Sequence, residues 1–219
     1  KMHLPKISVI GGTGQLGSAL ASRLAKAGYA VTIGSRTVGS AQSRASELGN
    51  GLKGMSNTDA AQESELLIVT VPFSAQTATL ADIKPYVKGK IVVDTTVPLV
   101  PPKVMRVQLP EEGSAAARAA AMLGDDVRLV SAFHNVAAHR LAMDVDVECD
   151  ILVFGDEKAA RAEVVELADA IGLRGIHGGA LVNSAAAEAM TSLLIFINKN
   201  YKVDGAGIRI TGKLSVPNE

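Results

Sequence analysis

The chain of 219 residues has one cysteine, no tryptophan and only 3% aromatic residues. A single cysteine, Cys149, excludes an internal disulfide and is typical of a reducing compartment. Its apolar surroundings, CDILVFG, predict that it is a small buried side chain. Lysine plus arginine and aspartate plus glutamate balance at 22 each, so no excess of charge indicates nucleic acid or an anionic membrane as a partner.

Long apolar runs and reactive motifs are also missing. The densest late apolar run, SLLIFI at 192–197, is too short to cross a bilayer, and the sequence does not open with the pattern of a secretory signal. We therefore expect a soluble, cytoplasmic protein that acts on neither a membrane nor a nucleic acid. No triad, no His/Cys cluster and no paired carboxylates occur in a motif, so we expect no metal and no catalytic side chain.

The apolar residues that are present occur in short runs separated by helical patterns. This alternation predicts an α/β fold, a Rossmann-type doubly wound parallel sheet with a small C-terminal α/β lobe. We expect strands at 6–11, 30–35, 65–71, 89–96, 127–133 and 150–156. We expect helices at 15–28, 40–48, 74–87 (broken near Pro85), 114–123, 157–172 and 183–200, and a helix N-cap at Ser56 or Asn57 before the strand at 65–71.

Two segments predict irregular structure. Residues 97–113 hold four of the eight prolines and are interpreted as a loop, and LRGIHGG at 173–179 as a glycine turn before a helix capped at Asn183 and Ser184. We divide the chain into a Rossmann domain at 1–140 and a lobe at 141–219. Since one helix and a tail are all that follow residue 180, we expect the substrate at the carboxyl edge of the sheet, under a small lid.

The first expected strand leads into the glycine pattern G-x-G-x-x-G. Gly12 permits a tight turn, Gly14 lets the backbone approach a pyrophosphate, and Gly17 lets the following helix pack closely on the sheet. Phosphates would meet free N–H groups at the start of that helix. The pattern stands between an apolar strand and an uninterrupted helix, which is the context of a dinucleotide site.

The second expected strand ends in Ser35 and Arg36. An NAD site usually has an acidic residue here for the ribose hydroxyl, whereas an arginine suits the 2′-phosphate of NADP. From residue 30 onward the first acid is Glu47, inside the next expected helix. Arg36 offers a fork of donors, and Ser35 and Thr13 offer hydroxyls, so the sequence favours NADP(H).

The segment GGTGQLGSALASRLAKAGYAVTIGSR resembles the NADPH-dependent coenzyme F420 reductases, also called F420H2:NADP oxidoreductases, in which F420 is a deazaflavin. The resemblance covers nearly the whole chain, through GMSNTDAAQESELLIVTVPF, KGKIVVDTTVPLV, VSAFHNVAAHRL, VFGDE and LVNSAAAEAMTSLLIFI. It implies direct hydride exchange between the nicotinamide of NADP(H) and the deazaflavin ring. This chemistry belongs to the two coenzymes and needs no nucleophile or metal.

The resemblance also implies which residues form the site. Thr13, Gly14, Gln15 and Leu16 correspond to the pyrophosphate site, and Ser35 and Arg36 to the 2′-phosphate site. The pocket at the nicotinamide ribose corresponds to Val71, Pro72, Val97 and Ala138. Two positions depart from the family pattern. Ser40 stands where a relative has a lysine that helps to bind the 2′-phosphate, and Ala137 where a proline is frequent.

His134 follows an expected strand at its carboxyl end, so it either contacts the deazaflavin or is a loop histidine bonded to backbone. Within the same specific segment, Asn135 is a second candidate for substrate binding. His139 is interpreted as solvated, and His177 as a turn residue that could face the pocket. The stripe Met190, Leu194 and Ile197 is at helical spacing and is interpreted as core or as the surface of a homodimer.

Two other functions remain open. The N-terminal motifs are also similar to the cytosolic domain of membrane ferric reductases and, more distantly, to pyrroline-carboxylate reductases, so another acceptor, flavin or ferric, is an alternative. A non-catalytic NADP(H)-sensing module is the other. Oxidation of NADPH by coenzyme F420, by other acceptors, or by none would separate the three.

Overall fold

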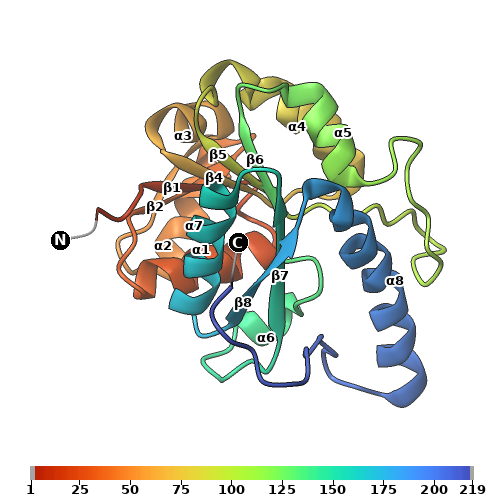
Figure 1. Ribbon diagram of the computed structural model, residues 1–219. Coiled ribbons are helices and arrows are strands. Elements are labelled where there is room, and N and C mark those ends of the chain that lie inside the picture. The colour runs from red at the N-terminus through yellow and green to blue at the C-terminus, as the bar shows by residue number, and fades with distance from the viewer. Residues whose placement is uncertain (1–2, 218–219) are drawn as a thin grey trace.

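The computed structural model describes residues 3–217, which form one eight-stranded sheet with helices on both faces (Figure 1). The strand order is β3-β2-β1-β4-β5-β6-β7-β8. The strands are β1 (Ile7–Ile10), β2 (Val31–Ser35), β3 (Lys53–Ser56), β4 (Leu66–Val69), β5 (Ile91–Asp94), β6 (Arg128–Ser131), β7 (Asp150–Gly155) and β8 (Arg174–Gly179). The first six are parallel, β7 runs antiparallel to β6, and β8 is parallel to β7.

Alternation along the strands assigns the apolar residues to two cores. In β4, Leu66 and Ile68 face one cluster, whereas Leu67 and Val69 face the other. The first cluster is covered by α1 (Gln15–Lys26), α2 (Val38–Leu48), α6 (Ala138–Leu141) and α7 (Lys158–Ala170). The second is covered by α3 (Asn57–Glu63), α4 (Phe73–Ile83) and α5 (Ala115–Leu123). The predicted Rossmann-type fold is therefore confirmed, and strands buried on both faces explain the continuous apolar runs.

The last long helix, α8 (Ser184–Tyr201), stands apart from these two layers. It packs beside α5, and the proline-rich segment 97–113 protrudes on the same side of the molecule (Figure 1). That segment holds no helix or strand, as predicted from its prolines. The break expected near Pro85 is also present, because α4 ends at Ile83 and a short 3₁₀ turn, η1 (Lys84–Tyr86), follows.

The prediction of a turn at 173–179 is wrong, since residues 174–179 of this stretch form the edge strand β8. The glycines serve close packing here. A Cβ on Gly175 would lie 2.8 Å from the carbonyl oxygen of Val165, and one on Gly178 would lie 2.3 Å from the ring of Phe154. Side chains are excluded at these points, so a strand carries a sequence that is typical of turns.

The edge strand β3 was not predicted, and its sequence KGMS explains why. Met55 is its one large apolar residue, and the strand is exposed or half-buried, so no apolar run marks it. Ser56 then caps α3, as predicted, because its hydroxyl accepts a hydrogen bond from the Asp59 N–H at 3.1 Å. Asn57, the other candidate cap, is the first residue of α3.

Candidate functional site

The turn after β1 requires glycine at its first two positions. Gly11 has a φ of +70°, and the Gly12 N–H donates to the carbonyl of Gly34 at 2.9 Å. A Cβ on Gly12 would lie 2.7 Å from the Val9 carbonyl oxygen, which real side chains do not tolerate. The chain therefore leaves the sheet in a tight turn, as the sequence pattern predicts.

The other two glycines of the pattern have different surroundings. A Cβ on Gly17 would lie 2.5 Å from the Thr70 hydroxyl and 2.8 Å from the Gly12 Cα, so glycine lets α1 pack closely. Gly14 is the N-cap of α1 and is exposed, and the nearest atom to its hypothetical Cβ is 3.8 Å away. Within residues 3–217, no side chain caps this helix. The open face of Gly14 beside the unpaired N–H groups of the first turn fits a pyrophosphate.

Two polar residues that sequence reasoning missed hold this turn in place. The Asn57 side-chain oxygen accepts the Gly11 N–H at 3.1 Å. The Thr70 hydroxyl lies 3.1 and 3.2 Å from the carbonyls of Ile10 and Gly11. Asn57 looked like a helix cap, and Thr70 like one residue of an apolar run. Their contacts are made between elements 46 to 60 residues apart, which no local pattern reveals.

The end of β2 lies next to the first turn of α2. Ser35 is half-buried, and its hydroxyl accepts the Thr37 N–H at 3.2 Å. Arg36 and Ser40 are both exposed, the latter as the third residue of α2. The N-cap Thr37 makes no side-chain cap. A guanidinium, two hydroxyls and a helix N-terminus thus gather at one edge, a combination that suits a phosphate dianion.

The residues expected at the nicotinamide ribose lie after the carboxyl ends of neighbouring strands. Val71 follows β4, and its Cγ1 lies 2.5 Å from where a Cβ of Gly11 would be, so it borders the glycine turn. Pro72 is the N-cap of α4, and Val97 follows β5 by three residues. Ala138 begins α6, which packs on α1. All four therefore belong to segments at the carboxyl edge, where α/β sheets bind ligands.

His134 and Asn135 are both buried and bonded inside the protein. His134 Nε2 lies 3.1 Å from the Ser131 hydroxyl, which in turn lies 2.6 Å from the Ser184 hydroxyl of α8. Burial lowers the pKa of His134 to about 4, so the ring is neutral at physiological pH. The Asn135 amide donates to the Ala187 carbonyl at 2.9 Å. These contacts attach the strand end to α8; direct contact with a substrate stays a prediction for both side chains.

The remaining histidines and the predicted cap have clear partners. His139 is largely exposed, as predicted, and lies 2.6 Å from Asp204. His177 belongs to β8, not to a turn, and its Nδ1 accepts from Arg161 at 3.3 Å. Asn183 is the N-cap residue of α8, as predicted, but its side chain does not cap the helix. It donates instead to the Gly178 carbonyl at 3.0 Å, and a short 3₁₀ turn, η2 (Leu181–Asn183), precedes α8.

The single cysteine and the predicted stripe on α8 follow the sequence reasoning. Cys149 is buried, and burial raises the pKa of its thiol. On α8, Leu194 is buried, whereas Met190 and Ile197 are half-buried.

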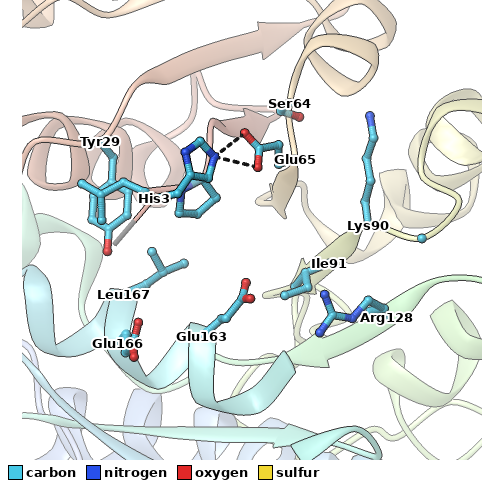
Figure 2. Close-up of a pocket in the computed structure, with 13 residues that line it drawn as sticks. His3, Tyr29, Ser64, Glu65, Lys90, Ile91, Arg128, Glu163, Glu166 and Leu167 are labelled. Atoms are coloured by element: carbon cyan, nitrogen blue, oxygen red, sulfur yellow. Dashed lines mark hydrogen bonds and ion pairs between the residues drawn. The ribbon is translucent and has the colours of Figure 1, made fainter. Parts of the chain in front are cut away.

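A groove of about 680 Å³ lies at the opposite edge of the sheet (Figure 2). Its walls come from the residues that precede the strands, including Glu65 before β4 and Lys90 before β5, and from Glu163 of α7. His3 reaches across to the Glu65 carboxylate at 3.1 Å. Since the glycine turn and Arg36 follow the carboxyl ends of their strands, this groove is separate from the candidate coenzyme site.

Comparison with known proteins agrees with this geometry. Residues 6–98 match the family model described as NADP oxidoreductase coenzyme F420-dependent. The chain is 42% identical to the F420-dependent NADP reductase of Methanothermobacter marburgensis over 94% of its own length and 98% of the relative. The corresponding enzyme of Methanocaldococcus jannaschii is 40% identical over 94% and 98%.

The fold of the whole chain also has a counterpart among solved structures. A putative F420-dependent NADP reductase from Arthrobacter sp. FB24 superposes with a TM-score of 0.81, at 23% identity, over 95% of this chain and 100% of that one. This similarity supports the fold, and the sequence identity to the archaeal enzymes supports the family. The chain belongs to the family of F420-dependent NADP reductases.

Proposed function

We propose that this protein catalyses reversible hydride transfer between NADP(H) and coenzyme F420. The observation that carries the proposal is the edge at β1 and β2, where the open Gly14 backbone and the exposed Arg36 fit a dinucleotide with a 2′-phosphate. Membership of the family, at about 40% identity over nearly the full length, indicates that the second coenzyme is F420.

Each part of the edge has a proposed role. Backbone N–H groups of 13–16 bind the pyrophosphate at the start of α1, and Gly12 and Gly17 shape the turn. Ser35 and Arg36 bind the 2′-phosphate, with Ser40 as a neutral neighbour. Val71, Pro72, Val97 and Ala138 line the pocket of the nicotinamide ribose. The deazaflavin side is proposed near His134 and Asn135, completed by the lobe 141–219.

The two coenzymes supply the reaction itself, in which a hydride passes from the nicotinamide to the deazaflavin or back. The protein's part is to bring two flat rings to reacting distance and to keep water out. The apolar side chains proposed at the ribose suit this purpose. His134 is neutral, buried and bonded to Ser131, which suits a fixed wall beside the rings. No side chain is proposed to form a covalent bond to either coenzyme.

A spectroscopic assay tests the proposal. Purified protein is mixed with NADPH and coenzyme F420, and absorbance at the deazaflavin band is followed together with NADPH oxidation. We expect both to fall in a 1:1 ratio. Oxidation with flavin or ferric chelates alone would favour a reductase of another acceptor. Tight NADPH binding without turnover of any acceptor would favour a sensing module.

We further propose that the protein is a cytoplasmic homodimer formed through α8. Leu193 and Phe196 are 44% and 51% exposed on its outer face, and Val182, just before the helix, is 76% exposed. By length and hydropathy the stretch Leu181–Tyr201 could span a membrane. Its inner face, however, buries Ser184 and Glu188 against the protein. A second copy of the same apolar face would cover the outer side.

Phe196→Glu tests this assembly. A carboxylate in the centre of an apolar interface would be desolvated without a partner, so we expect the variant to be a monomer at concentrations where the wild type is a dimer. Sedimentation measures the mass, and the exposed Tyr201→Glu change at the end of α8 serves as a control for added charge. A wild-type protein that sediments as a monomer would contradict the proposal.

A further inference from the structure

Three of the five buried residues of α8 are polar, which is unusual for a helix of a protein interior. Ser184, Glu188 and Ser192 are 0%, 1% and 3% exposed and lie at helical spacing on one face. Burying a carboxylate is costly unless its hydrogen bonds are satisfied. The polar residues on this face therefore mark specific contacts of α8 with the rest of the site.

Glu188 makes the most demanding of these contacts. Its two carboxylate oxygens accept the N–H groups of Ala115 at 2.5 Å and Ala116 at 3.2 Å, the first two residues of α5. Ser114 caps the next N–H, that of Ala117, at 2.8 Å. The free N–H groups at the start of α5 are thus satisfied partly by a side chain more than seventy residues away in sequence. An ionised carboxylate suits this position because the N-terminus of a helix is positive.

A second buried acid lies close to this contact. Asp94, at the end of β5, accepts bonds from the Thr96 N–H at 3.0 Å and from the Gln76 amide at 2.7 Å. The same amide donates to the Ala115 carbonyl at 2.8 Å. Ala115 is therefore held at its N–H by α8 and at its carbonyl by α4. The network joins the strand end that leads to Val97 with the helix that closes the loop 97–113.

Other polar residues of α8, on or beside the same face, contact the other half of the site. Ser184 bonds to Ser131, and the Thr191 hydroxyl donates to the His134 carbonyl at 2.8 Å. Ser192 donates to the Arg106 carbonyl, within the loop 97–113, at 3.3 Å. One helix thus connects the segment 131–135 with the loop 97–113 and the start of α5.

We propose that Glu188 is a positioning residue for hydride transfer, whose ionised carboxylate locks the N-terminus of α5 to α8 and so fixes the loop 97–113 against the segment 131–135. The inference rests on the function proposed above, and Glu188 itself touches neither coenzyme. When the carboxylate takes up a proton, one oxygen becomes a donor facing an N–H group, and the lock loosens.

The charged groups around Glu188 determine the pH at which its carboxylate takes up a proton. Burial and the charge of Asp94 raise the pKa of Glu188 to about 7, against the two N–H bonds, which lower it. Of the other ionisable groups on the elements around it, His134 is neutral, Arg118 of α5 is paired with Glu112 at 2.6 Å, and Lys103 and Arg106 of the loop 97–113 are exposed. Among the described residues, the charge that shifts the pKa of Glu188 is therefore that of Asp94. The lock is therefore closed above about pH 7 and opens as the pH falls through that value.

Glu188→Gln tests the lock, because the amide resembles the protonated acid at every pH. We expect kcat at pH 8.5 to fall about tenfold while the KM for NADPH changes less than threefold. Since the coenzymes' own titrations are common to all variants, the variant-to-wild-type ratio of kcat is the readout. It should rise from about 0.1 at pH 8.5 towards 1 at pH 5.5, where the wild type is protonated too. Glu163→Gln, an exposed change on α7, should give a ratio of 1 throughout.

A ratio of 1 at all pH values, or a reduced ratio that does not vary with pH, would overturn the proposal. If the variant does not fold, NMR spectra of the wild-type protein test the proposal instead. The amide resonances of Ala115 and Ala116 should titrate with a midpoint near pH 7, and their failure to do so would also overturn it. Failure of the proposed function is distinguishable, because the wild type would then not turn over coenzyme F420 while the amide titration would still report on the lock.

Discussion

Replacement of Arg36 by alanine is expected to raise the KM for NADPH about 30- to 100-fold and to leave the KM for NADH nearly unchanged. A guanidinium fork makes charge-assisted, bidentate bonds to a phosphate, and each such bond is about twice as strong as a neutral one. Arg36 is exposed at the end of β2, and no acidic side chain lies between it and Glu47 in the sequence. Steady-state kinetics with both nucleotides measure the change.

Three further variants make this test specific. Arg36→Lys keeps the charge but loses the fork, so it should retain part of the preference for NADPH. Lys53→Ala removes an exposed positive charge on β3 and should leave both KM values within about twofold. Ser40→Lys should lower the KM for NADPH about two- to fivefold, which is the range expected for an exposed ion pair. Equal weakening of both nucleotides by Arg36→Ala would contradict the assignment of the 2′-phosphate site.

The coenzyme edge could be predicted from the sequence because its signals are local. Gly12, Gly14 and Gly17 act through backbone geometry within one strand–turn–helix unit, and Arg36 ends the next strand. The alternation of apolar runs likewise predicted six of the eight strands. The strands that were missed, β3 and β8, carry too few apolar residues, because one lies at an exposed edge and the other needs glycine for close packing.

The inner part of the site could not be predicted, since its contacts are distant in sequence. Asn57 and Thr70 hold the glycine turn from other elements, and Glu188 reaches the start of α5 across 73 residues. In the sequence, Glu188 is one acid in an apolar helix, which suggests the outer face. Its burial follows from the N–H groups of Ala115 and Ala116 at the start of α5, because the local cap Ser114 bonds only to the Ala117 N–H. The need for an acceptor at these N–H groups can be recognised only once the positions of α5 and α8 relative to each other are known.

The C-terminal tail, residues 202–217 after α8, is likewise held in place by one buried acid. The Asp150 carboxylate, fully buried at the start of β7, accepts two bonds from Arg174, at 2.7 and 2.6 Å, and the Ile210 N–H at 2.6 Å. The backbone N–H of Asp150 donates to the Ile208 carbonyl at 2.7 Å. Burial raises the pKa of Asp150, but the bonds from Arg174 and Ile210 outweigh it and leave the pKa below its ordinary value.

This attachment bears on the site because the tail also packs against α6. A Cβ on Gly205 would lie 2.8 Å from the Cβ of Ala137, the residue before Ala138, and Asp204 pairs with His139. The tail therefore supports the helix proposed to line the nicotinamide pocket. Because the pKa of Asp150 is depressed in the folded state, its contribution to stability is complete above about pH 4 and is lost as the pH falls through the folded value.

Asp150→Ala is therefore expected to lower the free energy of unfolding by about 3 kcal/mol at pH 7, since a carboxylate buried with several donors is lost and the Ile210 N–H has no partner. Asp150→Asn keeps the shape of the side chain and should lower the free energy of unfolding by less than Asp150→Ala does. Asp146→Ala, an exposed change four residues earlier, should stay within about 0.5 kcal/mol. Urea unfolding at pH 7 measures the stability, and limited trypsin digestion at Lys202 and Arg209 measures release of the tail. An Asp150→Ala protein that is as stable and as resistant to trypsin as the wild type would show that the tail is held by its apolar contacts, with Gly207 packed against Cys149, and not by the buried carboxylate.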